Sequence, residues 1–381
     1  MLRKRKNTCR ALMLILAILL TALMASCTEA ALNTGNEAAA YEQPAAQASQ
    51  GNSVGAPAVS DGPDVGLGLL TVTFIDVGQA DATLLEQGGM AMLIDGGSPE
   101  DSNLIFTVLR DRGIERLDHV IATHAHADHV GGLSGALRQA TAGAAWCPVT
   151  DYDTRAFRNF VSGLEDAGSG ITVPEPGTWF MLGTARVEFL GPSEINEGEP
   201  NDTSLIIKVT HGDVSFLFTG DAERNAELRL VEEGRDLSAD VIHVGHHGSS
   251  TSSAYPFLRE VMPLYAVISC GRGNQYGHPH EDVMSRLRDA GAAVYRTDMQ
   301  GDITAVSDGA SVSFVTARNA DAVTNPGSAR QPEDSYIGNA NSLKFHRQSC
   351  TGLPAEHNRV TLGSLEEAYE KGFDPCGICR P

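Results

Sequence analysis

Three histidines and an aspartate stand within six consecutive positions, which is the densest group of potential metal ligands in the chain. They are His124, His126, Asp128 and His129, and only Thr123 separates them from the run Leu-Asp-His-Val-Ile-Ala at 117–122. That run has the length and composition of a short buried strand. Side chains two residues apart in an extended chain point the same way, so the first two histidines would face one ion. Asp128 and His129, at the following turn, would face a neighbouring ion. Imidazole and carboxylate ligands suit zinc, manganese or iron, so the spacing predicts a site for two divalent ions.

Other polar side chains follow other predicted strands. Asp221 comes after the strand 214–218, and His246 and His247 come after the strand 240–244. His278 and His280 precede a predicted helix. Asp81 and Asp95 end two early strands, where they could either orient ligand histidines through hydrogen bonds or simply form turns.

The elements that must hold these residues alternate between strands and amphipathic helices, which indicates a layered α/β body. Strands are predicted at 69–77, 82–85, 90–94, 117–122, 186–190, 205–209, 214–218, 240–244, 293–296, 303–306 and 312–316, and helices at 102–112, 133–139, 154–166 and 282–290. His211 falls in the predicted hairpin turn 210–213, where we expect an exposed side chain. His243 lies within an apolar strand, where we expect a hydrogen-bonded core residue.

The segment His124-x-His126-x-Asp128-His129 resembles the signature of the metallo-β-lactamase fold superfamily. The segments 76–82, 93–97, 218–223 and 244–249, in this order, most resemble the hydrolase domain of ComEC-type DNA-internalisation competence proteins, over about residues 69–318. The resemblance implies a four-layered αββα sandwich with a metal site at one rim of its two sheets.

The resemblance also implies roles for individual residues. Asp221 would bridge the two ions, His246 would be a ligand, and His247 would contact a substrate phosphate or orient a ligand, although these two roles could be reversed. His278 would contact a phosphoryl oxygen or act as general acid. The predicted ligands are therefore His124, His126, Asp128, His129, Asp221 and His246, and the predicted catalytic residues are Asp128, His247 and His278.

One ligand of the superfamily pattern is missing from this sequence. The superfamily normally has a further ligand histidine before the bridging aspartate, but the only histidine in residues 130–220 is His211. The segment 201–204 stands at about the expected place. We therefore expect one ion to have a poorer ligand set, completed by water or by Asn201 or Asp202.

The N-terminal residues have the pattern of a bacterial secretory signal. A basic stretch to residue 10 precedes an apolar run, 11–25, that is too short to span a membrane. Residues 23–27 resemble a lipobox, so residues 1–27 are predicted to be a lipoprotein signal peptide with lipidation at Cys27. The alternative is an uncleaved anchor. Residues 28–66 are rich in Ala, Gln, Ser and Gly and predict a disordered tether. The body at 67–318 would lie outside the cytoplasm, anchored to the membrane, with no protein partner predictable.

The charge balance argues against tight DNA binding. The chain has 28 Lys and Arg and 48 Asp and Glu; five of the basic residues and none of the acidic ones precede Cys27, so the rest carries a net charge of −25. Nucleic-acid binders usually show a basic surface. Turnover of a polyanion at a local cationic metal site is still compatible with this charge.

A separate small module is predicted after a linker at 319–335. Within 336–381, four soft ligands stand at spacings suited to tetrahedral zinc: His346, Cys350, Cys376 and Cys379. The module resembles the zinc-binding domain of Ada-type DNA-repair proteins, with His346 in place of one of four cysteines. A disulfide is the alternative, but three cysteines cannot all pair. Cys147 and Cys270 are expected to be buried thiols.

Together these features predict an extracytoplasmic metal-dependent hydrolase, a phosphodiesterase or nuclease that uses a metal-activated water. The cofactors would be two divalent ions, Zn or Mn, and one structural Zn in the tail. DNA is the substrate that the resemblance favours. One alternative is hydrolysis of a small or lipid-linked ester, such as a phosphorylcholine ester or a lactone. The other is a non-catalytic, metal-stabilised surface binding protein.

Overall fold

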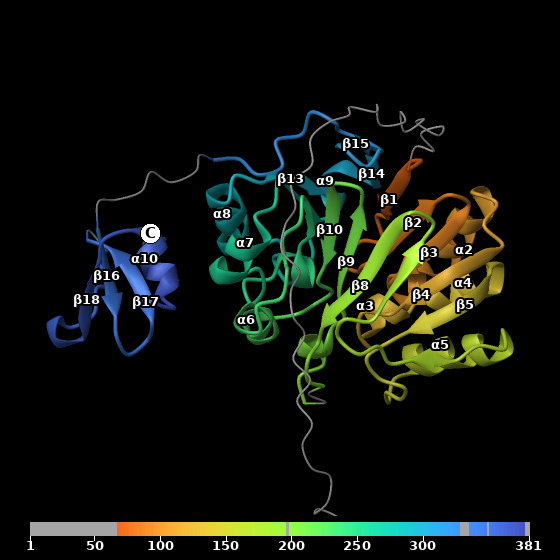
Figure 1. Cartoon of the computed structure of the whole chain (residues 1–381), viewed down its shortest axis with the longest axis horizontal. Helices are drawn as coiled ribbons and strands as arrows, with labels where there is room; N and C mark the ends of the chain where they lie inside the picture. Colours follow the sequence, from red (N-terminus) through yellow and green to blue (C-terminus); the bar gives the residue numbers. More distant parts are fainter. Residues whose placement is uncertain (1–66, 196–197, 328–334, 349, 378–381) are drawn as a thin grey trace, which may run out of the picture. The chain divides into compact units, whose positions relative to one another are not determined.

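Two sheets stacked face to face form the body of the protein (Figure 1). The computed structural model describes residues 67–195, 198–327, 335–348 and 350–377. The first sheet has eight strands, in the order β15 (Val312–Thr316), β14 (Ile303–Ser307), β1 (Leu70–Phe74), β2 (Thr83–Gln87), β3 (Met90–Ile94), β4 (Arg116–Ile121), β5 (Thr141–Trp146) and β6 (Ile171–Thr172). The second has seven, in the order β13 (Ala293–Arg296), β12 (Tyr265–Ile268), β11 (Val241–His243), β10 (Val214–Phe218), β9 (Ile206–His211), β8 (Ala185–Gly191) and β7 (Trp179–Leu182).

Apolar side chains from both sheets fill the space between them. Val72 and Phe74 of β1 belong to the same buried cluster as Phe216 and Phe218 of β10, and the rings of Phe74 and Phe218 stack with centroids 6.1 Å apart. Alternate residues of a strand face the same side, so each strand can contribute to this core and to the helix layer outside it. The shared core holds the two sheets in a fixed relation, which fixes the rim where the polar strand ends meet.

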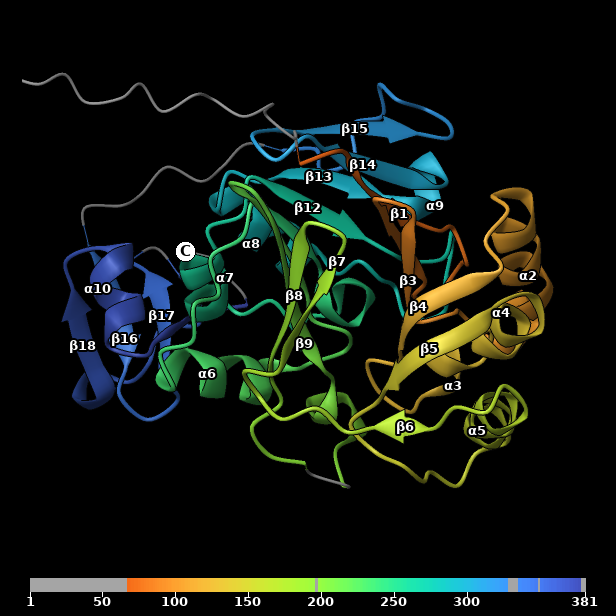
Figure 2. The same cartoon turned by 45° about the vertical axis from the view of Figure 1, so that its right-hand side comes forward.

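Helices cover the outer face of each sheet (Figure 2). One apolar cluster joins the eight-stranded sheet to α2 (Ser102–Asp111), α4 (Leu133–Gln139) and α5 (Arg155–Asp166). Another joins the seven-stranded sheet to α6 (Arg224–Glu232), α7 (Tyr255–Val261) and α8 (Glu281–Asp289). The shorter helices are η1 (Pro99–Asp101), α3 (Ala127–Val130), η2 (Pro200–Thr203), η3 (Gly245–Gly248) and α9 (Thr297–Gln300). The predicted four-layered αββα sandwich is confirmed.

The prediction that His211 is an exposed turn residue is wrong. β9 extends through His211, which pairs with Val214, so the hairpin turn is only Gly212 and Asp213. The His211 side chain is fully buried, and its Nδ1 lies 3.0 Å from the Ser307 hydroxyl of β14 in the other sheet. β9 ends two residues beyond the predicted strand, and because strand side chains alternate, this extension places the imidazole in the core.

Residues 319–327 contact the body, although their composition is that of a linker. The side-chain amide of Asn319 donates to the Met299 carbonyl at 2.7 Å, and that of Asn325 donates to the Met284 carbonyl at 3.0 Å. Short polar side chains thus bind backbone carbonyls that face this segment.

The C-terminal residues form a small four-stranded sheet of their own, in the order β18 (Arg359–Leu362), β16 (Tyr336–Asn339), β17 (Lys344–Arg347) and β19 (Asp374–Pro375). The 3₁₀ turn η4 (Glu356–Asn358) precedes β18, and α10 (Leu365–Glu370) follows it. The Ser364 hydroxyl accepts from the Glu367 backbone N–H at 3.0 Å and so caps the start of α10. Five buried side chains, Tyr336, Phe345, Leu362, Ala368 and Phe373, make up its core.

The predicted signal peptide, the lipidation site Cys27 and the tether lie outside the described residues. Among the residues that are described, none of the helices has the length and apolar character needed to cross a bilayer.

Candidate metal centre

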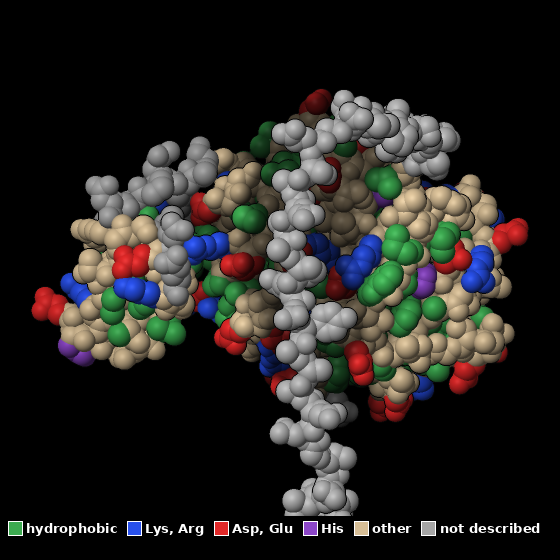
Figure 3. All heavy atoms as spheres, viewed as in Figure 1, with side chains coloured by type: hydrophobic (Ala, Val, Ile, Leu, Met, Phe, Trp, Pro, Cys, Tyr) green, Lys and Arg blue, Asp and Glu red, His purple; other side chains and the backbone are tan. Residues whose placement is uncertain are grey.

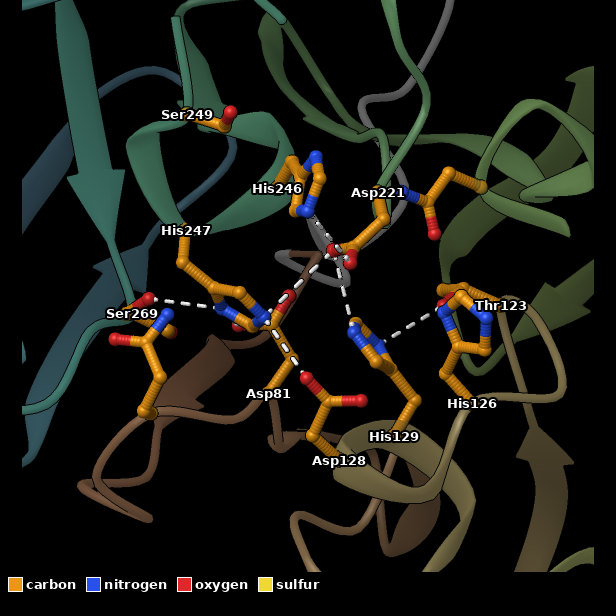
Figure 4. A network of polar contacts seen from close by, with 12 residues as sticks. Asp81, Thr123, His126, Asp128, His129, Asp221, His246, His247, Ser249 and Ser269 are labelled. Carbon is orange, nitrogen blue, oxygen red and sulfur yellow. Dashed lines mark hydrogen bonds and ion pairs between the residues drawn. The ribbon is translucent and has the colours of Figure 1, made fainter. Parts of the chain in front are cut away.

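Polar side chains from both sheets meet at one rim of the sandwich (Figure 4). From the first sheet come Asp95 after β3 and the segment 123–129 after β4. From the second come Asp221 after β10 and the histidines of η3 after β11. The parallel register of β3 with β4 and of β10 with β11 places these strand ends side by side.

One group of potential ligands consists of Asp128, His129, Asp221 and His247, whose nearest ligand atoms all lie within 4.8 Å of one another. His129 Nε2 is 3.2 Å from Asp221 Oδ1, and His247 Nε2 is 3.8 Å from the same oxygen. His247 Nε2 is also 3.5 Å from Asp128 Oδ2. Two imidazole nitrogens and two carboxylates thus lie close together, and both are ligand types that bind zinc in proteins.

A second group consists of His124, His126 and Asp221. His124 Nε2 lies 3.0 Å from His126 Nδ1 and 3.8 Å from Asp221 Oδ2. Asp221 therefore directs a different carboxylate oxygen toward each group, which is the arrangement of a bridging ligand.

Several buried nitrogen and oxygen atoms at this rim, within the part of the chain that the structure describes, have no hydrogen bond and could bind a cation. Among the described residues, His129 Nε2, Asp221 Oδ1 and His247 Nε2 are buried and lack a hydrogen bond of acceptable geometry. Buried polar atoms are rarely left without a partner, so such atoms call for an ion. The residues present therefore fit the pair of divalent ions that the sequence predicts.

The carboxylates also set the charge state of the histidines. Burial alone would lower the pKa of His129, but Asp221 and Asp95 outweigh it and raise the pKa well above its ordinary value. Asp221 and Asp81 do the same for the pKa of His247. A metal ligand must be unprotonated, so ion binding at this group is expected to release protons.

Asp95 and Asp81 lie where the sequence predicted supporting carboxylates. Asp95 Oδ2 is 2.8 Å from His129 Nδ1, and Asp81 Oδ1 is 3.3 Å from His247 Nδ1. Asp95 also accepts from the backbone N–H and the hydroxyl of Thr123, at 2.8 and 2.7 Å. In each case the carboxylate contacts Nδ1 of the imidazole, and Nε2 of the same ring faces the other ligands.

Of the two orders that the sequence left open for the adjacent histidines, the geometry favours His247 as a ligand. His247 belongs to the group around Asp128, whereas the sequence suggested His246 as the ligand and His247 as the substrate contact. Both residues have left-handed backbone conformations, with φ of 51° and 54°. Strand alternation does not apply to such a pair, so the sequence could not decide between them.

His278 and His280 lie near the centre without belonging to either ligand group. His278 Nδ1 is 3.2 Å from the Gln79 side-chain amide, its ring centroid is 5.7 Å from that of His246, and burial lowers its pKa to about 4. His280 Nδ1 accepts from the Ser250 backbone N–H at 2.9 Å. His280 therefore braces the 249–254 loop, while His278 faces the site.

Two supporting residues were missed at the sequence level. Thr123 connects Asp95 to the histidine segment, and Glu223 lies 3.2 Å from His246 Nδ1. Both are neighbours of predicted ligands in the sequence, and that adjacency was the available signal. Asn201 and Asp202, predicted as possible ligands, instead contact Glu223: the Asn201 amide lies 3.2 Å from its carboxylate, and Asp202 accepts its backbone N–H at 3.0 Å.

A cavity of about 550 Å³ opens beside the second group. Ala125, between the two histidines, and Thr203 of η2 form part of its wall, and the Tyr152 ring lies 6.2 Å from that of His126. Asp151 and Asp153 also line it, and none of its described lining residues is Lys or Arg.

The C-terminal sheet brings together three of its four predicted zinc ligands. His346, Cys350 and Cys376 are buried, with potential ligand atoms within 4.8 Å of one another. Cys379 lies outside the described residues. Cys147 and Cys270 are both buried free thiols in the body, as predicted.

Comparison with known proteins shows the family to which the chain belongs. The family model described as Metallo-beta-lactamase superfamily matches residues 75–272, more than half of the chain. ComE operon protein 3 of Bacillus subtilis (strain 168) is 28% identical over 250 residues, covering 61% of this chain and 32% of that protein. Competence protein ComA of Neisseria gonorrhoeae is 32% identical over 232 residues, covering 60% of this chain and 31% of that protein.

Recombination protein 2 of Haemophilus influenzae is 33% identical over 239 residues, covering 61% of this chain and 28% of that protein. The chain thus spans about a third of the length of these relatives. The predicted resemblance to competence proteins is confirmed, and the chain belongs to the metallo-beta-lactamase superfamily.

Proposed function

We propose that the protein is a metal-dependent phosphodiester hydrolase that acts on DNA. The observation that carries the proposal is Asp221, a buried carboxylate with one oxygen directed to each ligand group. In the proposed assignment His124, His126 and Asp221 hold one ion, and Asp128, His129, His247 and Asp221 hold the other. The resemblance to DNA-internalisation competence proteins is what favours a nucleic-acid substrate in this proposal.

Bound ions would supply an activated water and neutralise the non-bridging oxygens of the ester. The chain's own residues do the positioning. Asp95 and Asp81 fix the rings of His129 and His247, so that Nε2 of each faces inward. His278, beside the ligands and held by Gln79, is placed to contact a phosphoryl oxygen.

The decisive experiment is hydrolysis of single- and double-stranded DNA and of a chromogenic phosphodiester, with and without Mn²⁺ or Zn²⁺. Asp128→Ala should abolish metal-dependent cleavage. Asp213→Ala is the matched control, because Asp213 stands in the turn at the opposite end of β10 from Asp221. Cleavage that survives in Asp128→Ala would refute the assignment. A folded, metal-loaded protein without turnover would favour the non-catalytic binding protein.

The cavity beside His126 favours a second candidate, hydrolysis of a small or lipid-linked ester. Its wall carries two carboxylates and a tyrosine, which suit a neutral or cationic substituent rather than a polyanion. Asp153 is paired with Arg158, whereas Asp151 has no ion pair among the described residues. The visible face of the body also shows acidic and basic side chains interspersed (Figure 3).

Salt dependence separates the two candidates. Binding of a polyanion releases counterions, so DNA hydrolysis measured as kcat/KM should fall steeply with rising salt. Hydrolysis of a phosphorylcholine ester at the same metal centre should change little.

The C-terminal module is proposed to hold one structural zinc through His346, Cys350, Cys376 and Cys379. A core of five buried side chains is small for a sheet of this kind, and metal binding would stabilise it. We also propose that the protein is an extracytoplasmic lipoprotein attached through Cys27. Radiolabelled palmitate incorporation, lost in Cys27→Ala, tests that attachment.

A further inference from the structure

We propose that His246 is the third protein ligand of the ion held by His124 and His126, in place of the histidine that the sequence lacks between residues 130 and 220. The inference rests on the proposed metal centre and assigns one ligand within it. It makes the adjacent histidines 246 and 247 ligands of two different ions.

The position of the His246 ring supports this assignment. Its Nε2 lies 3.7 Å from Asp221 Oδ2, and His124 Nε2 lies 3.8 Å from that same oxygen. Ligands about 2.1 Å from a tetrahedral ion lie roughly 3.4 Å from one another. The distances of both nitrogens from Asp221 Oδ2 exceed this value by only about 0.3 and 0.4 Å. His246 is not in the group of ligand atoms within 4.8 Å that contains His124 and His126, so the assignment rests on its position relative to Asp221. Figure 4 shows the His246 ring directed at this carboxylate.

The contact behind His246 repeats that of His129 and His247. His246 Nδ1 is 3.2 Å from Glu223 Oε1, as His129 Nδ1 is from Asp95 and His247 Nδ1 is from Asp81, at 2.8 and 3.3 Å. A carboxylate on one ring nitrogen with the metal on the other is the usual setting of a ligand histidine. All three rings have a carboxylate on Nδ1 and Asp221 near Nε2.

The segment 201–204 stands where a ligand histidine was expected, and its residues hold Glu223 in position. Asn201 and Asp202 contact the side chain and the backbone N–H of Glu223. Ser204, in the same segment, accepts from the Asp221 backbone N–H at 3.0 Å. These residues are positioning residues that act through Glu223 and Asp221.

The backbone of η3 explains how neighbours can face different ions. Two successive left-handed residues turn the chain so that the His246 and His247 rings lie on different sides of Asp221: Nε2 of His246 is near Oδ2, and Nε2 of His247 is near Oδ1. Residues other than glycine rarely take this conformation, and such strain is concentrated at functional sites. The competing role for His246 is contact with substrate only.

The test is metal content of the full chain. Wild type, His246→Ala and Glu223→Gln are loaded with Mn²⁺ or Zn²⁺, dialysed, and compared by elemental mass spectrometry and by calorimetric titration. His246→Ala should lose one ion per chain relative to wild type. Glu223→Gln should weaken one of the two ions about 10- to 100-fold and leave the other unchanged. Circular dichroism checks folding, and Glu223→Gln keeps the test decisive if His246→Ala is unfolded.

His278→Ala is the matched control, because its ring also lies beside His246 but its Nδ1 contacts an amide rather than a carboxylate. It should keep the wild-type ion content. If His246→Ala binds as many ions as wild type with unchanged affinity and only KM rises, His246 contacts substrate and the inference is wrong. A wild-type protein that binds its ions but cleaves no phosphodiester would refute the proposed function while this result still stands.

Discussion

Glu227 is expected to make the stability of the body depend on pH between about 4.5 and 7. This α6 carboxylate is 1% exposed and accepts from the backbone N–H groups of Ser253 and Ala254. Burial raises its pKa from 4.5 to about 7, against the lowering effect of those two donors and of Arg286 and Arg224. In the folded state it therefore keeps a proton that the unfolded chain has already released.

The sign and size of the effect follow from this difference. Between pH 4.5 and 7 the folded state binds more protons than the unfolded state, so the free energy of unfolding falls as the pH rises. A shift of about 2.5 pKa units corresponds to roughly 3 kcal/mol lost across this range. Glu227→Gln cannot ionise and should lose that slope. It should also cost about 1–3 kcal/mol at low pH, because its amide N–H faces one of the backbone donors.

Urea unfolding at pH 5, 6, 7 and 8, at constant metal concentration, measures the slope for both proteins. The difference between wild type and variant isolates Glu227 from the other titrating groups. Exposed Glu232→Gln on the same helix is the control and should keep the wild-type slope. Equal pH dependence in wild type and Glu227→Gln would refute the reasoning.

Other substitutions test separate parts of the structure. Asp95→Asn removes the carboxylate behind His129 and should weaken metal binding about 10- to 100-fold in calorimetric titration; an unchanged Kd would contradict its role. Gly248→Ala should lower the free energy of unfolding by more than about 1 kcal/mol, because φ is +83° and a Cβ would lie 2.6 Å from Pro279; a neutral result in urea unfolding would disprove this. His211→Ala should cost about 1–3 kcal/mol in the same assay while ion content stays constant, and loss of an ion would instead assign it to the centre. Cys350→Ser should remove one zinc per chain by elemental analysis, and retention of that zinc would favour another ligand set.

Four helices and most strands could be predicted because their apolar periodicity is strong, and the two-sheet sandwich was implied by the family resemblance. The helices α6 and α7 and the strands β5, β7 and β12 were not predicted. The helix expected at 133–139 is α4, Leu133–Gln139, and the helix expected at 154–166 is α5, Arg155–Asp166. The first ligand segment was also predictable, since His124 and His126 share a side and stand within hydrogen-bonding distance.

The sequence was least informative where the conformation of two backbone residues decides the direction of a side chain. Two additional paired residues in β9 buried His211. Two left-handed residues direct the rings of His246 and His247 to different oxygens of Asp221. Neither backbone conformation can be recognised from the types of the residues, because the packing around each turn imposes it. The contact of Glu223 with His246 could not be predicted either, because only the fold brings these two residues together. Glu223 is the residue that precedes helix α6.

The rim draws its ligands from two sheets whose shared interface is mainly apolar. Asp95 and the segment 123–129 follow strands of the eight-stranded sheet. Asp221 and the η3 histidines follow strands of the seven-stranded sheet. An ion bound between them would crosslink two regions far apart in sequence, much as a disulfide does, but reversibly. At 100 times its Kd each such ion would add about 2.7 kcal/mol to the free energy of unfolding. Metal supply would then control how long the folded enzyme survives as well as whether it is active.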